Sequence, residues 1–302
     1  MQYIIINTLI VTLSLFCLGL MIKKSRKQPS GSLTRLGHIH LMISGVVAFF
    51  MDTIGVGSFA CNIALANYFK TFKDEELPGM LNGAQVLPGA LEALFFLGVI
   101  HVDLITLTTL IAATCLGGIL GASIISKLNA QALRIVMLIA FPTIIFLILC
   151  NQFQWLPIGG DKIALEGHEL IWGFMGLLIA GALTAAGVGL FAMIQAVLFC
   201  LGMSPLIAFP IMTAAGALQQ PLSTWIFVIK NKVPLKKTLL ISLYGVLGVL
   251  LALPIITHLS TSKLHILLII VLTYNTIRMA VSYLKHRRTL HFPEAPQVYQ
   301  QL

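Results

Sequence analysis

The sequence predicts an all-α polytopic membrane protein, on three observations. Of the 302 residues 58% are apolar and only 10% are charged, and the mean hydropathy is +0.97, which lies far outside the range of soluble domains. The apolar residues form blocks long enough for helices to cross a hydrocarbon core of roughly 30 Å. Two blocks share an internal repeat. We expect two inverted repeats, each a Gly-broken re-entrant helix hairpin plus three transmembrane helices, preceded by one extra N-terminal helix.

The formal charge of +9 could suggest a nucleic-acid partner, but the placement of the basic residues along the sequence argues against one. Basic residues are not interleaved with aromatic ones, as they are in many nucleic-acid interfaces, but fall between apolar blocks. This placement is typical of the positive-inside rule of membrane proteins. The predicted partner is therefore the lipid bilayer and not a nucleic acid.

Residues 3–22 form the first apolar segment. No positive residue precedes it, and Lys23, Lys24, Arg26 and Lys27 follow directly. A secretory signal peptide carries its positive charge first, so this order predicts a transmembrane helix with its N-terminus outside. Residues 1–37 are then this helix and a basic cytoplasmic loop.

The remaining apolar blocks include two that are too long for one helix. The blocks lie at roughly 38–69, 78–100, 103–126, 134–150, 168–202, 205–229, 238–257 and 264–284. About 20 residues suffice to cross the hydrocarbon core, so the blocks at 38–69 and 168–202 must overshoot the membrane or break. Each has a glycine-rich stretch at its centre, GVGSFA at 55–60 and GVGLFA at 187–192.

These two stretches lie 132 positions apart, and other residues match at the same offset. The matches are Ala48 with Ala180, Pro78 with Pro210, Met80 with Met212 and Leu107 with Leu239. Such self-similarity predicts a tandem duplication. The expected organisation is repeat 1 at 38–151, an extracytoplasmic linker at 152–167, repeat 2 at 168–285 and a cytoplasmic tail at 286–302.

Each long block could span once or return as a re-entrant hairpin, and the distribution of charge favours hairpins. With two hairpins only Lys162 and Lys263 lie outside. Single spans would move Lys70, Lys73, Lys127 and Arg134 outside and Lys162 inside, which fits the positive-inside rule less well. A hairpin plus three crossings is an odd number of passes, so the second repeat would be inverted. The chain would then cross seven times and end in the cytoplasm.

Broken helices place backbone N–H groups at the membrane midplane, where the positive end of the helix dipole attracts an anion. Glycine lets the backbone turn and approach a ligand closely. We therefore predict Gly55, Gly57, Gly187 and Gly189 as substrate-binding positions. The alternative is that these glycines only allow close helix packing.

Neutral polar residues near the breaks could hydrogen-bond a small anion without burying another full charge. The predicted ligands are Ser58, Asn82, Gln85, Thr213 and Gln219. They belong to a wider cluster that also contains Asp52, Thr53, Asn62, Thr184, Gln195, Gln220, Ser223 and Thr224. Hydrogen bonds between helices are the alternative role for these side chains.

Glu92 lies well inside the block at 78–100, where an ionisable group is costly and should face the interior or water. It is the first candidate for proton coupling, and Asp52 is the second. No catalytic or cofactor motif and no metal-ligand spacing occurs. We therefore expect no enzymatic activity, cofactor or metal.

The chain resembles the sulfite exporter TauE/SafE family of bacterial membrane proteins over roughly residues 38–284. The resemblance rests on DTIGVGSFA at 52–60, DEELPGMLN at 74–82 and GVGLFA at 187–192. It implies a carrier in the bacterial plasma membrane that exports small sulfur oxyanions or organosulfonates, and it implies a homodimer. The family motif usually has more consecutive glycines and a following Thr-Ser pair, which this chain lacks, so the substrate is predicted only as a small anion. An anion channel, a carrier for another solute and a membrane enzyme are the alternatives.

Overall fold

The computed structural model describes residues 2–28, 33–54, 56–97, 102–153, 155 and 159–254, and the single positions 273, 277, 281 and 284. Within these ranges the chain is helical and contains no strand. Gly55, most of the predicted last helix at 264–284 and the tail at 286–302 lie outside the described residues.

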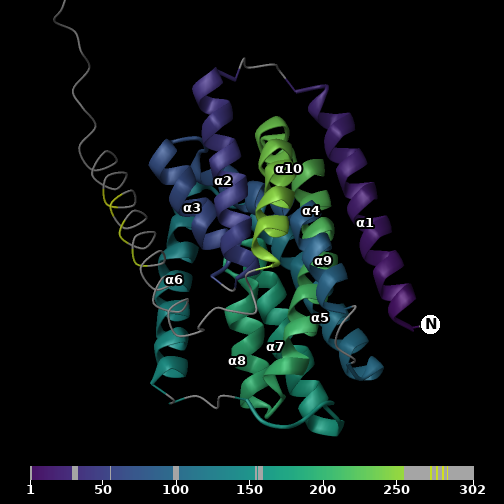
Figure 1. Cartoon of the computed structure of the whole chain (residues 1–302). Coiled ribbons are helices and arrows are strands. Elements are labelled where there is room, and N and C mark those ends of the chain that lie inside the picture. Colours follow the sequence, from purple (N-terminus) through teal and green to yellow (C-terminus); the bar gives the residue numbers. More distant parts are fainter. Residues whose placement is uncertain are drawn as a thin grey trace, which may run out of the picture.

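Ten α-helices and one 3₁₀-helix make up the described part (Figure 1). They are α1 (Gln2–Ser25), α2 (Arg35–Thr53), α3 (Ser58–Phe69), η1 (Asp74–Glu76), α4 (Leu77–Leu97), α5 (Leu104–Ile125), α6 (Ala130–Gln152), α7 (Gly167–Ala185), α8 (Leu190–Cys200), α9 (Pro205–Ile229) and α10 (Leu235–Ala252). By length and composition, six of the helices in the described ranges could cross a membrane: α1, α2, α4 together with η1, α5, α7 and α10. This confirms a helical, membrane-embedded protein.

The first long apolar block is broken into α2 and α3, as its glycines predicted. After α2 ends, the Val56 N–H donates to the Met51 carbonyl at 2.8 Å, and Gly57 has φ +94°, which L-residues rarely adopt. The ring of Phe69 at the end of α3 stacks on His40 in the first turns of α2, with 4.2 Å between the ring centroids. The chain therefore returns along α2.

The second long block is broken in the same way into α7 and α8. Gly187 has φ +102°, and the Val188 N–H donates to the Leu183 carbonyl at 3.3 Å. Lys162, which precedes α7, donates its N–H to the carbonyl of Gly202, which follows α8, at 3.2 Å. The segment before α7 and the segment after α8 therefore lie side by side. In Figure 1 this pair lies in the lower half of the bundle, whereas α2 and α3 lie in the upper half.

The long helices pack across the two halves of the chain: α5 lies along α7, α10 along α2 and α4 along α9. Glycines make two of these contacts close. A Cβ at Gly117 would overlap the Leu178 carbonyl, and a Cβ at Gly248 would overlap the Val46 carbonyl. Small residues at such positions let helix backbones approach one another, which is a major source of packing in membrane bundles.

Three connections lie together at one end of the bundle. The Lys24 ammonium, at the end of α1, donates to the Val228 carbonyl at 3.1 Å. The Lys237 ammonium, at the start of α10, donates to the Thr71 carbonyl at 2.7 Å. The segments that follow α1, α3 and α9 are therefore neighbours. Together with the adjoining turns of α1, α2 and α10, they carry most of the described Lys and Arg residues.

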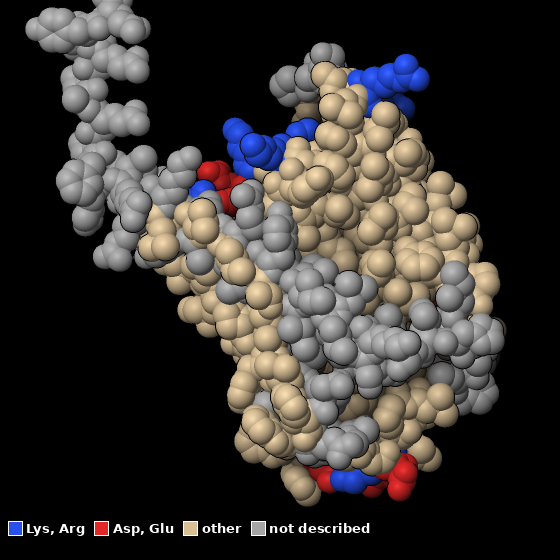
Figure 2. Space-filling model, turned by 60° about the vertical axis from the view of Figure 1, so that its left-hand side comes forward, with Lys and Arg blue, Asp and Glu red and all other residues tan. Residues whose placement is uncertain are grey.

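The charged side chains on one face are confined to its two ends. Figure 2 shows Lys and Arg at the upper end, some of them beside acidic residues, and a smaller mixed group at the lower end. The lower end contains the ion pair between Lys162 Nζ and Glu169 Oε1, at 2.5 Å. Between the ends the described atoms on this face are uncharged, as a membrane-facing surface requires.

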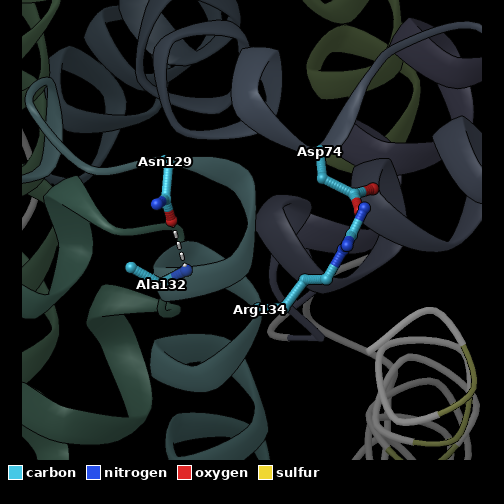
Figure 3. A network of polar contacts seen from close by, with 4 residues as sticks. All are labelled: Asp74, Asn129, Ala132 and Arg134. Carbon is cyan, nitrogen blue, oxygen red and sulfur yellow. Dashed lines mark hydrogen bonds and ion pairs between the residues drawn. The ribbon is translucent and has the colours of Figure 1, made fainter. Parts of the chain in front are cut away.

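α6 is joined to η1 by an ion pair. Arg134 Nε lies 2.5 Å from Asp74 Oδ2, and Figure 3 shows the two side chains pointing toward one another from different elements. In the same region Asn129 Oδ1 accepts the Ala132 N–H at 2.9 Å, which caps the start of α6 (Figure 3). Asp74 therefore ties the segment before α4 to the helix that ends the first half.

Candidate functional site

The two broken regions meet on α4. Asn82 and Gln85 are buried and, three residues apart, share one face of this helix. Asn82 Nδ2 donates to the Pro78 carbonyl of its own helix at 2.9 Å and also lies 3.5 Å from the Thr184 carbonyl, at the end of α7. Gln85 Nε2 donates to Asp52 Oδ2, at the end of α2, at 2.5 Å. One turn of α4 thus contacts both breaks inside the bundle.

A closed hydrogen-bond network fills the first break. Asp52 Oδ1 accepts the Ser58 N–H at 2.7 Å, and the Ser58 hydroxyl donates to Gln85 Oε1 at 2.5 Å. Because Ser58 is the first residue of α3, the Asp52 carboxylate caps that helix at its positive end. Three predicted site residues are therefore brought together, and the carboxylate itself holds donors that were predicted for a substrate.

Glu92 lies two turns beyond Gln85 on α4 and is 2% exposed. Thr53, the residue next to Asp52, has its hydroxyl oxygen 2.6 Å from Glu92 Oε1 and 2.9 Å from the Phe49 carbonyl, so its one proton is shared between these two acceptors. In the described part of the chain neither carboxyl forms an ion pair with Lys, Arg or His. Two buried carboxyls with neutral partners can take up and release protons between them.

The second break has no such cap. Thr184, which stands 132 positions after Asp52, donates its hydroxyl to the Ala180 carbonyl at 2.8 Å, within its own helix. Among the described hydrogen bonds, none joins a side chain to the N–H groups at the start of α8, whereas Asp52 accepts the Ser58 N–H at the start of α3. A Cβ built at Gly189 or at Gly57 would meet no heavy atom of the described structure within 4 Å. Both helix starts border open space.

Gly187 packs more tightly than these two glycines. A Cβ there would lie 3.0 Å from Leu81 of α4 and 3.2 Å from Met137 of α6, and 4.0 Å from Ile63 of α3. The second break therefore contacts the helix that starts at the first break. Gly187 thus lies where the two broken regions pack together, whereas no described atom lies within 4 Å of a Cβ built at Gly57 or Gly189.

Two predicted ligands point elsewhere. Thr213 donates its hydroxyl back to the Phe209 and Pro210 carbonyls of its own helix, at 3.3 and 3.1 Å. Gln219 donates to Ser223 Oγ at 2.6 Å and packs against α5. The hydrogen bonds of Thr213 and Gln219 thus stay within α9. Among the described contacts, none brings either side chain to a break.

Gln220 was left out of the predicted ligands, although it lies beside the network of the first break. A Cβ at Gly89 would lie 3.3 Å from Gln220 Oε1 and 3.4 Å from Gln85 Nε2. A Cβ at Gly216 would meet both Gln220 and Leu190, the first residue of α8. Gln220 therefore stands between the two broken regions. The sequence placed Gln220 only in the wider polar cluster, and the matching position in repeat 1 is Pro88, so the repeat did not single it out.

Several buried polar atoms of the central helices have no hydrogen-bond partner, and those of Asn62 and Asn82 belong to side chains on α3 and α4. In the central helices they are both amide atoms of Asn62, Asn82 Oδ1, Gln219 Oε1 and Thr224 Oγ1. Most buried polar atoms in folded proteins are paired with protein or water. Asn62, whose amide nitrogen and oxygen are both unpaired on the helix that starts at the first break, is therefore a side chain with hydrogen bonds still to make.

A surface hollow lies elsewhere, at the end where the connections gather. It is lined by Gln28, Lys73, Glu75, Glu76, Asn231, Lys232, Val233 and Pro234. Its mixed charges favour neither an anion nor a cation strongly. The buried polar residues at the breaks are the better candidate for a binding site, because they combine helix ends, neutral donors and orphaned atoms.

In comparisons with protein-family models, with curated proteins and with solved structures, the chain matches none.

Proposed function

We propose that the chain is a secondary transporter of small oxyanions, an exporter of the kind found in the sulfite exporter TauE/SafE family. The observation that carries the proposal is the meeting of two broken helices on α4, where Asn82 contacts one break and Gln85 the other. Broken helices at the interface of two repeats are how many carriers build a substrate site.

The two halves are proposed to be inverted repeats with re-entrant hairpins. Backbone details that recur 132 positions apart support this. They are the Val56 to Met51 and Val188 to Leu183 bonds, the Thr71 to Ala66 and Met203 to Leu198 bonds, and the positive φ of Lys70 and Gly202. Each hairpin also ends beside its own start. A shared ancestral unit explains both features.

The end that gathers the connections after α1, α3 and α9 is proposed to be cytoplasmic, by the positive-inside rule. Lys70 and Lys73 then lie on the same side as Lys230 and Lys232, as hairpins require. The N-terminus would lie outside and the C-terminus inside, and the membrane would be a bacterial plasma membrane. The homodimer remains an expectation from the family resemblance.

Substrate binding is assigned to the open helix starts. N–H groups following Gly57 and Gly189 provide the positive dipole ends, and the neutral side chains of Ser58, Asn82 and Gln85 provide or orient hydrogen bonds. Neutral donors suit an anion that must be released again, since no buried cation holds it. Rocking of one repeat against the other would open this position to each side in turn.

Proton coupling is assigned to Glu92 and Asp52. Glu92 is buried and bonded only to a hydroxyl among the described contacts, so its charge can change without breaking an ion pair. The substitution Glu92→Gln keeps the size of the side chain and an oxygen that can accept from Thr53, and it removes the exchangeable proton.

Uptake into liposomes tests the function. Purified protein is reconstituted, and labelled sulfite, sulfate and a short organosulfonate are followed with and without a proton gradient. The expected result is saturable uptake of at least one anion, which the gradient drives in the wild type but not in Glu92→Gln. Asp103→Asn, an exposed acid at the start of α5, is the matched control and should behave as the wild type. The absence of flux for all three anions would refute the oxyanion carrier, and flux that does not saturate would favour a channel.

A further inference from the structure

We propose that the Asp52 carboxylate is a tethered competitor of the transported oxyanion. In this arrangement the substrate binds at the start of α3 only when Asp52 has taken up a proton and released the Ser58 N–H. The proposal rests on the proposed carrier function. It adds a specific coupling rule, one proton bound for each anion bound.

The geometry of the first break carries the idea. Both carboxylate oxygens of Asp52 are occupied, one by the Ser58 N–H at 2.7 Å and the other by Gln85 Nε2 at 2.5 Å. A free oxyanion would need the same two donors. The carboxylate therefore already occupies the position that an anion would take at this helix end.

There is room and an unused ligand next to this position. The Cβ direction of Gly57 borders open space. Asn62 lies one turn after Ser58 on the same face of α3, is 1% exposed, and both its amide oxygen and its amide nitrogen are without partners. An anion that displaced Asp52 could keep the Ser58 N–H and also accept a hydrogen bond from Asn62 Nδ2, so this orphaned donor would become paired.

The second half lacks the competitor. At the matching position Thr184 bonds back into its own helix, and α8 starts without a side-chain cap. The matching position of Glu92 is Thr224, also neutral. Proton control is therefore built into one repeat only, and the start of α8 remains open to an anion whatever the protonation of the first half.

The ionisable groups around Asp52 are few. α4 contributes Glu92 and α3 contributes Cys61, both of which interact electrostatically with Asp52. The described ionisable groups of α10 are Lys236, Lys237 and Tyr244, in its first three turns, where Lys237 bonds the Thr71 carbonyl and Tyr244 bonds His38. Glu92 is therefore the group most able to exchange a proton with Asp52.

The charges balance over one binding event. A proton adds to the Asp52 carboxylate and gives a neutral acid, which is a weak acceptor for the Ser58 N–H. The incoming anion replaces the carboxylate there, so the negative charge at the helix end is conserved. When the anion leaves, Asp52 loses its proton and caps α3 again. Anion and proton thus bind and leave together.

Binding of methanesulfonate to purified protein tests the rule, because this anion keeps its charge across about pH 5 to 8. Calorimetry in buffers of different ionisation enthalpy gives the Kd and the protons taken up. We expect uptake of one proton and a Kd that rises about tenfold per pH unit while Asp52 is ionised, and neither effect in Asp52→Asn. An Asp52→Asn protein that keeps the wild-type proton uptake would overturn the proposal.

A second measurement does not depend on the choice of substrate. Asp52→Ala leaves the Ser58 N–H without its carboxylate, so the variant should unfold at a lower temperature than the wild type. Formate, which carries the missing group, should restore part of the loss in Asp52→Ala. It should not stabilise the wild type or Gly117→Ala, a variant that loses no carboxylate and places a methyl group against the Leu178 carbonyl. Equal effects of formate on all three proteins would contradict the proposal. If the wild type carries anions in liposomes but these tests fail, only the coupling rule is wrong.

Discussion

Asn82 and Gln85 stand one turn apart on α4 and hold the ends of two different broken helices, α7 through the Thr184 carbonyl and α2 through the Asp52 carboxylate. The 3.5 Å contact of Asn82 is long for a hydrogen bond, whereas that of Gln85 is short. α4 is therefore bound firmly to the break in its own half and weakly to the break in the other. A movement between the halves would break the Asn82 contact first.

The conformation of Gly57 predicts an asymmetric effect of alanine at two matched glycines. Gly57 has φ +94° and Gly189 has φ −58°, while both border open space. Gly57→Ala should lower the free energy of unfolding by about 1–3 kcal/mol through backbone strain, and Gly189→Ala should change it little. Thermal unfolding in detergent measures both, and equal losses would show that the backbone conformations are not those described.

Close packing of α5 on α7 and of α10 on α2 predicts similar losses at two other glycines. Gly117→Ala and Gly248→Ala each place a methyl group against a backbone carbonyl of the neighbouring helix, and overpacking of this kind costs about 1–3 kcal/mol. Gly19→Ala, whose new methyl group would meet no described atom within 4 Å, is the control. Unfolding that is unchanged at Gly117 and Gly248 would argue against these helix contacts.

The hairpin topology predicts which loops share a side of the membrane. In a chain whose native cysteines are replaced, Lys70→Cys and Lys230→Cys should react with a membrane-impermeant maleimide from the same side, and Lys162→Cys from the opposite side. All three lysines are exposed. Labelling of position 162 from the same side as position 230, with position 70 on the opposite side, would instead support a single continuous crossing by each long block.

Asp103 gives a pH effect outside the membrane-spanning helices. The Thr106 N–H and hydroxyl both donate to its carboxylate at 2.8 Å, and these hydrogen bonds lower the pKa of Asp103 below its ordinary value. A lowered pKa means that its stabilisation is present above about pH 4 and is lost as the pH falls through the folded value. The difference in unfolding temperature between wild type and Asp103→Asn should therefore shrink on acidification. A difference that grew at low pH would contradict this sign.

The positions of the breaks could be predicted because they depend on local sequence. A block that is too long for one crossing and has glycines at its centre can hardly remain one helix, so the interruptions after Thr53 and Ala185 followed from length and composition alone. The burial of Glu92 was predictable for a similar reason, since apolar residues surround it on both sides in the sequence.

The pairing of side chains could not be predicted, because it depends on how helices are rotated against one another. Gln219 and Gln220 are neighbours in sequence, but they point about 100° apart on a helix, and only packing decides that Gln220 lies beside Gln85. The hydrogen bond from the Ser58 N–H to Asp52 depends on the conformation of the few residues between them, which cannot be derived from sequence spacing. Thr213 bonds its own helix, a common choice for threonine in membrane helices.

Counterflow is the measurement that tests the carrier most directly. Liposomes containing the protein are loaded with unlabelled sulfite or organosulfonate and diluted into a trace of the labelled anion. A site that opens alternately to each side must exchange its occupant, so the labelled anion should accumulate transiently above its equilibrium level, and more slowly when Asn82→Leu removes the polar contact between α4 and the second break. Labelled anion that rises only to equilibrium, with no transient excess in the wild type, would contradict alternating access and would leave a channel as the better account.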